Sequence, residues 1–317
     1  MQTEIAELTT PAQVGCPTCG DERGRVLLRA PDRYHGRHVQ YQLLRCPSCS
    51  LVWLQDPPKP YEMGEHYGPD YDRSVAAAGK SPDRWRGRVE TLTQYKAGGS
   101  ILDLGCSSGG FLSALKNPAW KLYGIEMSDE VAQRAHDDTG ADVFVGDILD
   151  APYPAGSFDA ITCFHVFEHL YQPREILAKV SHWLKPGGIF YAMMPNIDSA
   201  GARIFKSYWY ALELPRHLYH FSPISLKNTA HSVGLVEVSV TTHREMFIEQ
   251  STRYIVDEMY RKIGLSRPPL SKSLHRNLAR RALRKAFHLT LLPVLAGMAS
   301  VVGDGESIHA IFAKPGL

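Results

Sequence analysis

The chain has 317 residues and a mass of 35.4 kDa, enough for one large domain with small additional modules. Its hydrophobic content of 44% and charged content of 21% are typical of a soluble globular protein, and a net charge of +2 neither favours nor excludes nucleic acid. Residues 1–13 contain no signal-like apolar region, and no apolar run reaches about 18 residues. We therefore expect a cytoplasmic protein without a transmembrane segment.

Two Cys-x-x-Cys pairs mark the first unit, residues 14–56, which follows a loose leader at residues 1–13. Each pair lies in a tight turn with Pro and Ser or Thr, and strand-like runs at 25–28 and 39–44 separate the turns. Four thiolates that converge on one tetrahedral Zn²⁺ would form a structural zinc ribbon, which would depend on the metal for much of its stability. Redox motifs or unligated thiols are the alternative, but the paired turns favour zinc. The predicted metal ligands are Cys16, Cys19, Cys46 and Cys49.

Residues 57–98 are expected to be a connector that ends in a helix. A Pro-rich stretch at 57–60 precedes a cluster of Tyr, Gly and Pro at 61–71 without periodicity, which predicts a loop, and a helix is expected over 82–96. Tyr67 and Tyr71 in this loop could line a pocket or simply pack against the next domain.

From residue 99 onward, apolar strands alternate with amphipathic helices. Strands are predicted at 100–104, 121–126, 142–145, 158–164, 188–194, 235–241 and 307–313, with helices at 109–117, 128–138, 173–184 and 223–233. This alternation predicts an α/β fold with a seven-stranded, doubly wound, Rossmann-like sheet formed by residues 99–242 and 307–317. A ligand is expected at the carboxyl ends of the strands. Residues 243–306 would be a helical insertion before the last strand.

The first predicted strand of this sheet ends in Asp103 and continues into a loop of small residues, from Gly105 to Gly110. Glycines allow positive φ angles and close approach of a ligand to the main chain, and a helix that starts there directs free N–H groups at the ligand. The second strand ends in Glu126, which could accept both ribose hydroxyls of a nucleoside. Asp147 and Ile148 follow the third strand, where they could bind and pack against an adenine. Each acid alone is more often a solvated residue or a helix cap.

These motifs together resemble those of class I S-adenosylmethionine-dependent methyltransferases, over about residues 98–242 and the final strand. The resemblance rests on D-L-G-C-S-S-G-G-F-L, G-I-E-M-S, V-G-D-I-L, F-D-A-I-T-C-F-H-V-F-E-H-L and L-K-P-G-G-I-F. One glycine of the family's usual Gly-x-Gly is a serine here, while a dehydrogenase would have Gly-x-Gly-x-x-Gly. The resemblance implies S-adenosylmethionine as cofactor, bound by Asp103, Gly105, Cys106, Gly109, Glu126, Met127, Asp147, Ile148, Phe164 and His165.

Histidines are concentrated in two later segments, around the end of the fourth strand and before the helix at 223–233. His165 and His169 follow the fourth strand, whose carboxyl end should face the sulfonium, and His217 and His220 precede Ser222, a predicted helix cap. A single buried histidine is usually structural, but two groups at one edge of the sheet favour a reaction site.

The cysteine pairs, the tyrosine-containing connector and the later histidine segment also resemble zinc-containing sugar C-methyltransferases. By that likeness His217 would be a general base, with His169 and Tyr71 nearby. Arg216 stands where that group has an acid, and its large carboxyl-terminal domain is missing, so carbon methylation does not carry over. The candidate catalytic residues are His217, then His169 and His165. The acceptor would contact Tyr67, Tyr71, Arg216, Tyr219 and His220.

The predicted function is O-methylation of a small-molecule acceptor, such as a sugar, a glycolipid or a natural-product intermediate, with a histidine as general base. A zinc-ribbon RNA methyltransferase, a sugar C-methyltransferase and a non-catalytic scaffold are the alternatives. Nucleic acid is disfavoured as a partner because residues 14–56 are not strongly basic.

The predicted insertion has an unusual charge distribution. Nine Arg and Lys and no acids occur between residues 261 and 285, before an apolar stretch at 286–298. This pattern is typical of a helix on an anionic membrane surface, so residues 261–298 could make a peripheral membrane contact. The alternative is a cap over the active site with a solvated basic face.

Overall fold

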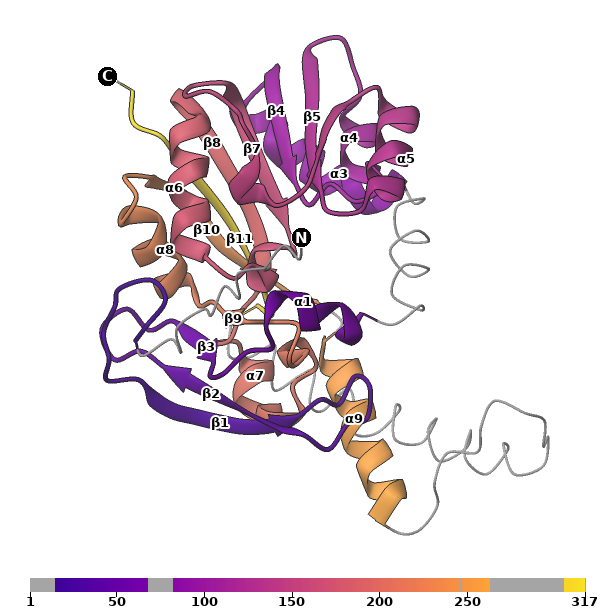
Figure 1. Ribbon diagram of the computed structural model, residues 1–317, viewed down its shortest axis with the longest axis vertical. Coiled ribbons are helices and arrows are strands. Elements are labelled where there is room, and N and C mark those ends of the chain that lie inside the picture. Colours follow the sequence, from indigo (N-terminus) through magenta and orange to yellow (C-terminus); the bar gives the residue numbers. More distant parts are fainter. Residues whose placement is uncertain (1–14, 68–81, 246, 263–304, 317) are drawn as a thin grey trace, which may run out of the picture.

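The computed structural model describes residues 15–67, 82–245, 247–262 and 305–316 (Figure 1). The strands are β1 (Arg25–Pro31), β2 (Gln40–Arg45), β3 (Val52–Leu54), β4 (Gly99–Leu104), β5 (Trp120–Glu126), β6 (Asp142–Val145), β7 (Phe158–Phe164), β8 (Leu184–Pro195), β9 (Tyr219–His220), β10 (Val236–His243) and β11 (Ser307–Ala313). The α-helices are α1 (Pro60–Met63), α3 (Pro82–Tyr95), α4 (Gly110–Leu115), α5 (Asp129–Thr139), α6 (Pro173–Trp183), α7 (Ala200–Phe205), α8 (Pro223–His231) and α9 (Phe247–Lys262). Short 3-10 helices are η1 (Gly64–His66), η2 (Ile148–Asp150), η3 (Phe167–His169), η4 (Lys206–Tyr208) and η5 (Tyr210–Leu212).

The larger sheet has seven strands in the order β10-β11-β8-β7-β4-β5-β6, which confirms the predicted fold class. Strands β8, β7, β4, β5 and β6 run parallel, whereas β11 is antiparallel to both of its neighbours, β8 and β10. Figure 1 shows α3, α4 and α5 on one side of this sheet and α6 and α8 on the other. The carboxyl ends of β4, β5, β6 and β7 therefore share one edge, where a ligand is expected.

The connector differs from the loop predicted at residues 61–71, because residues 60–66 form α1 and η1. Pro60 occupies the first turn of α1, where a missing N–H costs nothing. The carboxylate of Glu62 accepts a hydrogen bond from the Lys59 amide at 2.9 Å, which caps the helix start. This capping interaction stabilises a helix too short to show a periodic pattern.

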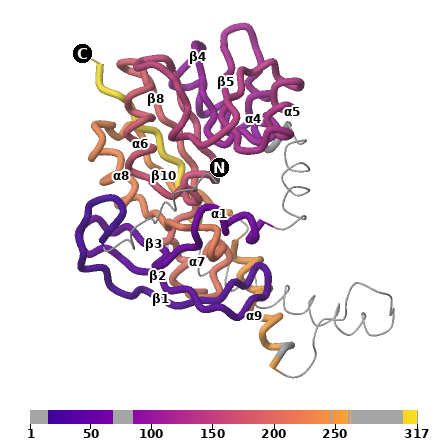
Figure 2. Tube along the Cα trace, viewed as in Figure 1, coloured from indigo at the N-terminus to yellow at the C-terminus, as the bar shows by residue number. Residues whose placement is uncertain are grey.

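A second sheet joins the cysteine-containing segment to the middle of the chain. Its order is β1-β2-β3-β9, and all of its pairs are antiparallel. Strand β9 brings Tyr219 opposite Trp53 and His220 opposite Val52. In Figure 2 the indigo N-terminal strands lie beside this later part of the chain. The pairing of β9 with β3 therefore holds the histidine segment at 216–220 against the N-terminal unit.

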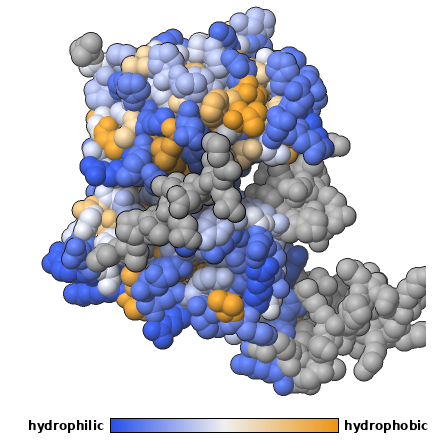
Figure 3. Space-filling model, viewed as in Figure 1, coloured by the Kyte–Doolittle hydropathy of each residue, from blue (hydrophilic) through white to orange (hydrophobic). Residues whose placement is uncertain are grey.

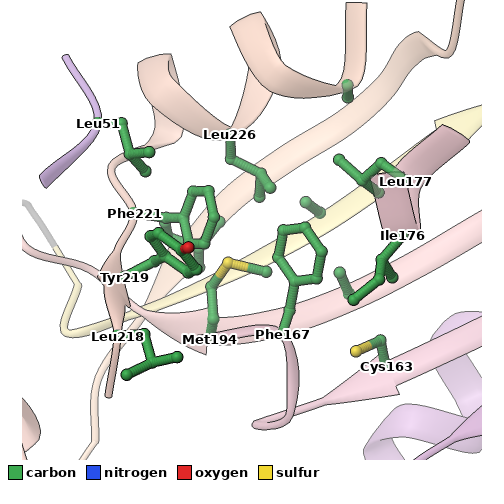
Figure 4. Packing of buried hydrophobic residues seen from close by; sticks show 14 of the residues in the cluster. Leu51, Cys163, Phe167, Ile176, Leu177, Met194, Leu218, Tyr219, Phe221 and Leu226 are labelled. Atoms are coloured by element: carbon green, nitrogen blue, oxygen red, sulfur yellow. The ribbon is translucent and has the colours of Figure 1, made fainter. Parts of the chain in front are cut away.

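Apolar side chains from both halves of the chain meet in one core (Figure 4). Phe167 stacks on Phe221, with ring centroids 5.1 Å apart, and Met194 lies beside this pair. Leu51, from the second cysteine turn, reaches the same cluster. Full burial of such side chains contributes roughly 1.5–3 kcal/mol each, so this core fixes η3 and β9 relative to the large sheet. On the face shown in Figure 3, apolar side chains form small separate patches within a mostly hydrophilic surface.

Within the predicted insertion at 243–306, residues 247–262 form α9. Most of the basic run and the apolar stretch at 286–298 lie outside the described residues. Among the helices that the structure describes, none combines the length and apolar character needed to cross a membrane.

Candidate active site

The loop after β4 takes the shape that its small residues predict. Gly105 has φ of +66°, and a Cβ built on it would lie 2.6 Å from Cγ2 of Val166, so only glycine fits there. Gly109 has φ of +77° and precedes the first residue of α4. Cys106 is buried against Gly124 on the neighbouring strand, which gives it a packing role beneath the loop. These contacts fix the course of the main chain from 105 to 109 at the carboxyl end of β4.

Asp103 lies below this loop, at the end of β4. Its carboxylate accepts a hydrogen bond from the Thr162 hydroxyl at 2.7 Å, which ties β4 to β7. Burial raises the pKa of Asp103 to about 7, because the charged form loses hydration. Asp103 is therefore buried between β4 and β7, beneath the loop.

Glu126 and Asp147 stand at the ends of β5 and β6, as predicted. The amides of Ser107 and Ser128 donate to the two carboxylate oxygens of Glu126, at 3.1 and 3.0 Å. Two N–H donors fix the orientation of this carboxylate beside the glycine loop, while its remaining lone pairs can accept hydroxyl protons. Asp147 caps η2 by accepting from the Leu149 amide at 2.7 Å, and Ile148 next to it is buried.

The end of β7 connects this edge to a cavity. Phe164 packs edge-on against Phe111 in α4, with ring centroids 4.9 Å apart. His165 has φ of +57°, which is rare for a residue with a side chain and is held by a hydrogen bond from its amide to the Met193 carbonyl. This strained backbone directs His165 into the lining of the cavity. Met127, at the end of β5, is largely exposed.

The cavity has a volume of about 910 Å³ and is lined from α3, η3, η5 and α9 and from the ends of β8, β10 and β11. Its histidines are His165, His169, His217, His243 and His309. Four acids, Glu90, Glu168, Glu213 and Glu245, also line it, together with Arg88. The volume is suitable for a small-molecule ligand.

His169 and His217 meet at the base of this cavity, with ring centroids 4.6 Å apart. Nδ1 of His217 lies 2.9 Å from the Ala211 carbonyl, and Nδ1 of His169 lies 3.0 Å from the Arg216 carbonyl. Because a carbonyl accepts only, each Nδ1 carries a proton, and in the neutral form of either ring Nε2 holds the lone pair. Burial, and then the neighbouring His169 and His220, hold the pKa of His217 well below its usual value.

Two acids lie near these rings: Glu213, whose carboxylate is 3.6 Å from Nε2 of His217, and Glu168. The side chain of Glu168 is 1% exposed, and neither carboxylate oxygen has a hydrogen-bond partner among the described residues. Nδ1 of His165 lies 3.5 Å from one of these oxygens, and Glu168, His169 and His217 each place a potential ligand atom within 4.8 Å of the others. We call His165, His169 and His217 the histidine cluster.

Arg216 lies next to the cluster but is engaged elsewhere. Its guanidinium pairs with Glu213 at 2.7 Å and stacks over the ring of Tyr34 at 4.1 Å. Tyr67 places its hydroxyl 3.3 Å from Nδ1 of His169, which brings the connector to the histidine cluster. Arg216 is therefore a structural tie between β9 and the N-terminal unit.

None of the four acceptor candidates that the structure describes, Tyr67, Arg216, Tyr219 and His220, lines the cavity. The hydroxyl of Tyr219 donates to the Tyr171 carbonyl at 2.6 Å, inside the shared core. His220 is buried, its two ring nitrogens have no partner among the described residues, and burial lowers its pKa to about 3. Tyr71 is outside the described residues.

Two of the cavity's histidines were not predicted from the sequence: His243 at the end of β10 and His309 near the start of β11. Their rings stack at 3.9 Å. Burial, and then His243, lowers the pKa of His309 to about 3. Each of these strands carries a single histidine, and an isolated histidine in a strand does not indicate a site.

The four cysteines of the N-terminal unit converge as predicted. Their sulfur atoms all lie within 4.8 Å of one another, and three of the four residues are buried. The two turns repeat one geometry: the Cys16 amide donates to Asp21 O and the Cys46 amide to Leu51 O, at 3.0 and 2.8 Å. A hydrogen bond from Cys49 is the main cause that lowers the pKa of Cys16 to about 5, toward the thiolate that binds metals. This donor set fits Zn²⁺.

Comparison with solved structures identifies the same fold in other proteins. Phosphoethanolamine N-methyltransferase 2 of Haemonchus contortus, solved with S-adenosyl-L-methionine, matches with a TM-score of 0.52 and 15% identity, over 84% of this chain and 63% of that chain. A SAM-dependent methyltransferase from Archaeoglobus fulgidus matches with a TM-score of 0.50 and 18% identity, over 74% and 95%.

Sequence comparison finds partial matches to curated proteins. An uncharacterized 37.1 kDa protein of transposon Tn4556 from Streptomyces fradiae is 33% identical over 111 residues, which is 33% of this chain and 32% of that protein. A ubiquinone biosynthesis O-methyltransferase from Xanthomonas axonopodis pv. citri is 30% identical over 151 residues, or 44% and 63%. The chain thus spans between about a third and just under two thirds of the length of these relatives.

A family model described as a methyltransferase domain matches residues 78–240, just over half of the chain. This range contains the glycine loop, Glu126, Asp147 and the histidine cluster. The chain therefore belongs to this methyltransferase family, and its seven-stranded sheet has the fold of class I S-adenosylmethionine-dependent methyltransferases.

Proposed function

We propose that this protein transfers the methyl group of S-adenosylmethionine to an oxygen atom of a small-molecule acceptor. One observation carries the proposal: a cavity lined by histidines adjoins the strand edge that carries the glycine loop, and His165 at the end of β7 belongs to both. A cofactor over the loop and an acceptor in the cavity would meet at this residue.

The cofactor half of the proposal rests on side chains already oriented for a nucleoside. Glu126 would accept the ribose hydroxyls, because two backbone amides hold its carboxylate beside the loop. Asp147 and Ile148 would bind the adenine, and the main chain at Gly105 and Gly109 would contact the methionine part. Met127 and Phe164 flank these positions.

Methyl transfer from a sulfonium is a displacement that depends mainly on positioning. The acceptor oxygen attacks the methyl carbon, the carbon–sulfur bond breaks, and S-adenosylhomocysteine leaves. The hydroxyl proton of the acceptor must go to a base, and we assign it to His217, with His169 as the second candidate. Burial keeps His217 neutral at pH 7, with a lone pair on Nε2.

The charges around the cavity favour an acceptor without strong negative charge. Four acids and one arginine line it among the described residues, so a phosphate-rich ligand such as RNA would be repelled. Oxygen as the acceptor atom agrees with the name of the Xanthomonas relative, a ubiquinone biosynthesis O-methyltransferase. A sugar, a glycolipid or a natural-product intermediate fits these conditions.

Carbon methylation of a sugar is the second candidate. It is favoured by the contact between His169 and His217 and by the approach of Tyr67 to His169, which would serve a proton abstraction from carbon equally well. Identification of the methylated atom in the product by NMR separates the two.

We also propose that Cys16, Cys19, Cys46 and Cys49 bind one structural Zn²⁺. A closed shell of four thiolates leaves no open position for substrate, so the ion would stabilise the turns and take no part in the reaction. Elemental analysis of the purified chain should give one zinc per molecule.

The activity is tested with methyl-labelled S-adenosylmethionine and a panel of hydroxylated acceptors, with release of S-adenosylhomocysteine as the readout. We expect turnover with at least one acceptor. In the His217→Ala variant we expect turnover to be abolished while cofactor binding is retained. Activity of that variant within a few-fold of the parent would contradict the assignment of His217.

A further inference from the structure

We propose that Glu168 is a positioning residue that supplies the counter-charge of the histidine cluster. Its carboxylate would offset the positive charge that one of these histidines acquires on taking the acceptor proton. This inference rests on the proposed function for the proton, and it adds a residue to which no role was assigned from the sequence.

The carboxylate of Glu168 lies in an environment that disfavours its negative charge. Glu168 is 1% exposed, and both of its oxygens lack hydrogen-bond donors among the described residues. A buried negative charge without a partner is strongly unfavourable, so it increases the affinity of the neighbouring imidazoles for a proton.

Three histidines lie close to Glu168. His165 lies after β7, with its Nδ1 3.5 Å from the carboxylate; His169 lies in η3, and His217 lies before β9. Cys163 in β7 is also close to Glu168: burial, and then the charge of Glu168, raise its pKa, so it stays a thiol. Among these described neighbours, the three histidines are the groups that can take up a proton beside Glu168 near neutral pH.

Glu213, the other acid near His217, already has a charged partner. Glu213 lies 3.6 Å from Nε2 of His217, but its carboxylate is paired with Arg216 at 2.7 Å. The charge of Glu213 is therefore already balanced, while that of Glu168 is not. Because burial disfavours the imidazolium of His217, an unbalanced carboxylate nearby is needed to make it an effective base.

The proton balance of the step follows from this arrangement. The acceptor oxygen forms its bond to the methyl carbon, the sulfur takes the electron pair of the broken carbon–sulfur bond, and the hydroxyl proton passes to an imidazole nitrogen. The buried edge then holds an imidazolium and a carboxylate, with no net charge. The proton leaves to solvent after product release.

The main chain of Glu168 keeps the two partners in register. Its carbonyl accepts a hydrogen bond from the Leu218 amide at 2.8 Å, directly after His217. The residue therefore positions the segment of His217 with its backbone and faces the cluster with its side chain.

The test is an NMR titration of the zinc-loaded, full-length chain with ¹³C-labelled histidine. Single variants at His165, His169 and His217 assign the resonances, and the comparison is Glu168→Gln against Glu175→Gln, an exposed glutamate on α6. Loss of the charge should lower the pKa of at least one cluster histidine by about one pH unit or more, and Glu175→Gln should leave all three unchanged. Unchanged values in Glu168→Gln would overturn the proposal.

A second measurement on the unmodified chain guards against misfolding of the variant. If the proposal holds, at least one cluster histidine becomes protonated between pH 7 and about pH 5; if all three stay neutral throughout, it fails. Metal analysis covers the competing role, because two zinc ions per chain, one of them lost in Glu168→Gln, would make Glu168 a ligand and overturn the proposal. Failure of the proposed function is seen separately, as lack of binding of S-adenosylmethionine.

Discussion

The amide of Leu218 donates a hydrogen bond of 2.8 Å to the carbonyl of Glu168, and through it two motifs about 50 residues apart in the chain form one site. The carbonyl of Leu218 in turn accepts from the amide of Leu54, also at 2.8 Å, in the N-terminal unit. The cysteine turns, the β9 segment and the histidine cluster are thus linked by consecutive main-chain contacts. Unfolding of the cysteine turns should therefore also disturb the histidine cluster.

Loss of one zinc ligand should therefore disturb more than the N-terminal unit. In Cys46→Ser we expect zinc content to fall from one per chain to near zero and the melting temperature to fall by about 10 °C, since a structural zinc contributes several kcal/mol to folding. Cys163→Ala, a buried cysteine outside the four, serves as control and should keep its zinc. A Cys46→Ser chain with parental melting temperature would contradict the structural role of the site.

Gly105→Ala should destabilise the chain by about 2–4 kcal/mol, because it combines a positive φ with a clash against Val166. Gly140→Ala is the matched control: φ is +74° there, but no atom lies within 4 Å of the new Cβ. Its cost should be limited to backbone strain, about 1–2 kcal/mol. Urea unfolding measures both, and equal losses would mean that the loop does not require the close approach of Val166.

Glu126→Gln should weaken binding of S-adenosylmethionine roughly 10- to 100-fold, because the amide replaces charged hydrogen bonds to the ribose worth about 1.5–3 kcal/mol. Glu130→Gln in α5 removes a surface ion pair with Arg134 and should leave the Kd unchanged. Calorimetric titration measures both constants. Equal affinity in the Glu126 variant and the parent would exclude Glu126 from the cofactor site.

Acid should destabilise the fold through its buried neutral histidines. Burial lowers the pKa of His220 to about 3, so the unfolded chain takes up this proton below its usual pKa while the folded chain does not. The free energy of unfolding should therefore decrease as pH falls from about 6.5 to 3, by about 1.4 kcal/mol per pH unit for this group.

His220→Phe keeps the buried ring and removes this proton. Its unfolding free energy, measured in urea at several pH values between 4 and 7, should depend less steeply on pH than that of the parent. His309, whose pKa is also about 3, still contributes to the remaining slope. Parallel pH profiles for parent and variant would show that His220 is not buried in its neutral form.

The parts of the structure with long periodic patterns were predictable from the sequence. The seven strands follow from repeated apolar runs between amphipathic helices, and the positions of Glu126 and Asp147 follow because parallel strands end at one edge. The pairing of β3 with β9 could not be predicted, since a two-residue strand has no period and its partner lies far away in the chain. Helix α1 depends on a local cap by Glu62, which periodicity does not reveal.

The candidate site was predictable only in part for a similar reason. His165, His169 and His217 stand in dense polar segments, whereas His243 and His309 become neighbours only when β10 and β11 pair. The assignment of Arg216 and Tyr219 to the acceptor could not be checked from the sequence, because their partners Glu213, Tyr34 and Tyr171 depend on tertiary packing.

We expect the glycine loop, Glu126 and Asp147 to form an S-adenosylmethionine site beside the histidine-lined cavity. Calorimetric titration of the zinc-loaded full-length chain with S-adenosylmethionine measures this binding. We expect one cofactor per chain, with affinity lowered at least about tenfold in Glu126→Gln and unchanged in Glu130→Gln. Absence of binding by the folded, zinc-loaded chain would contradict this expectation.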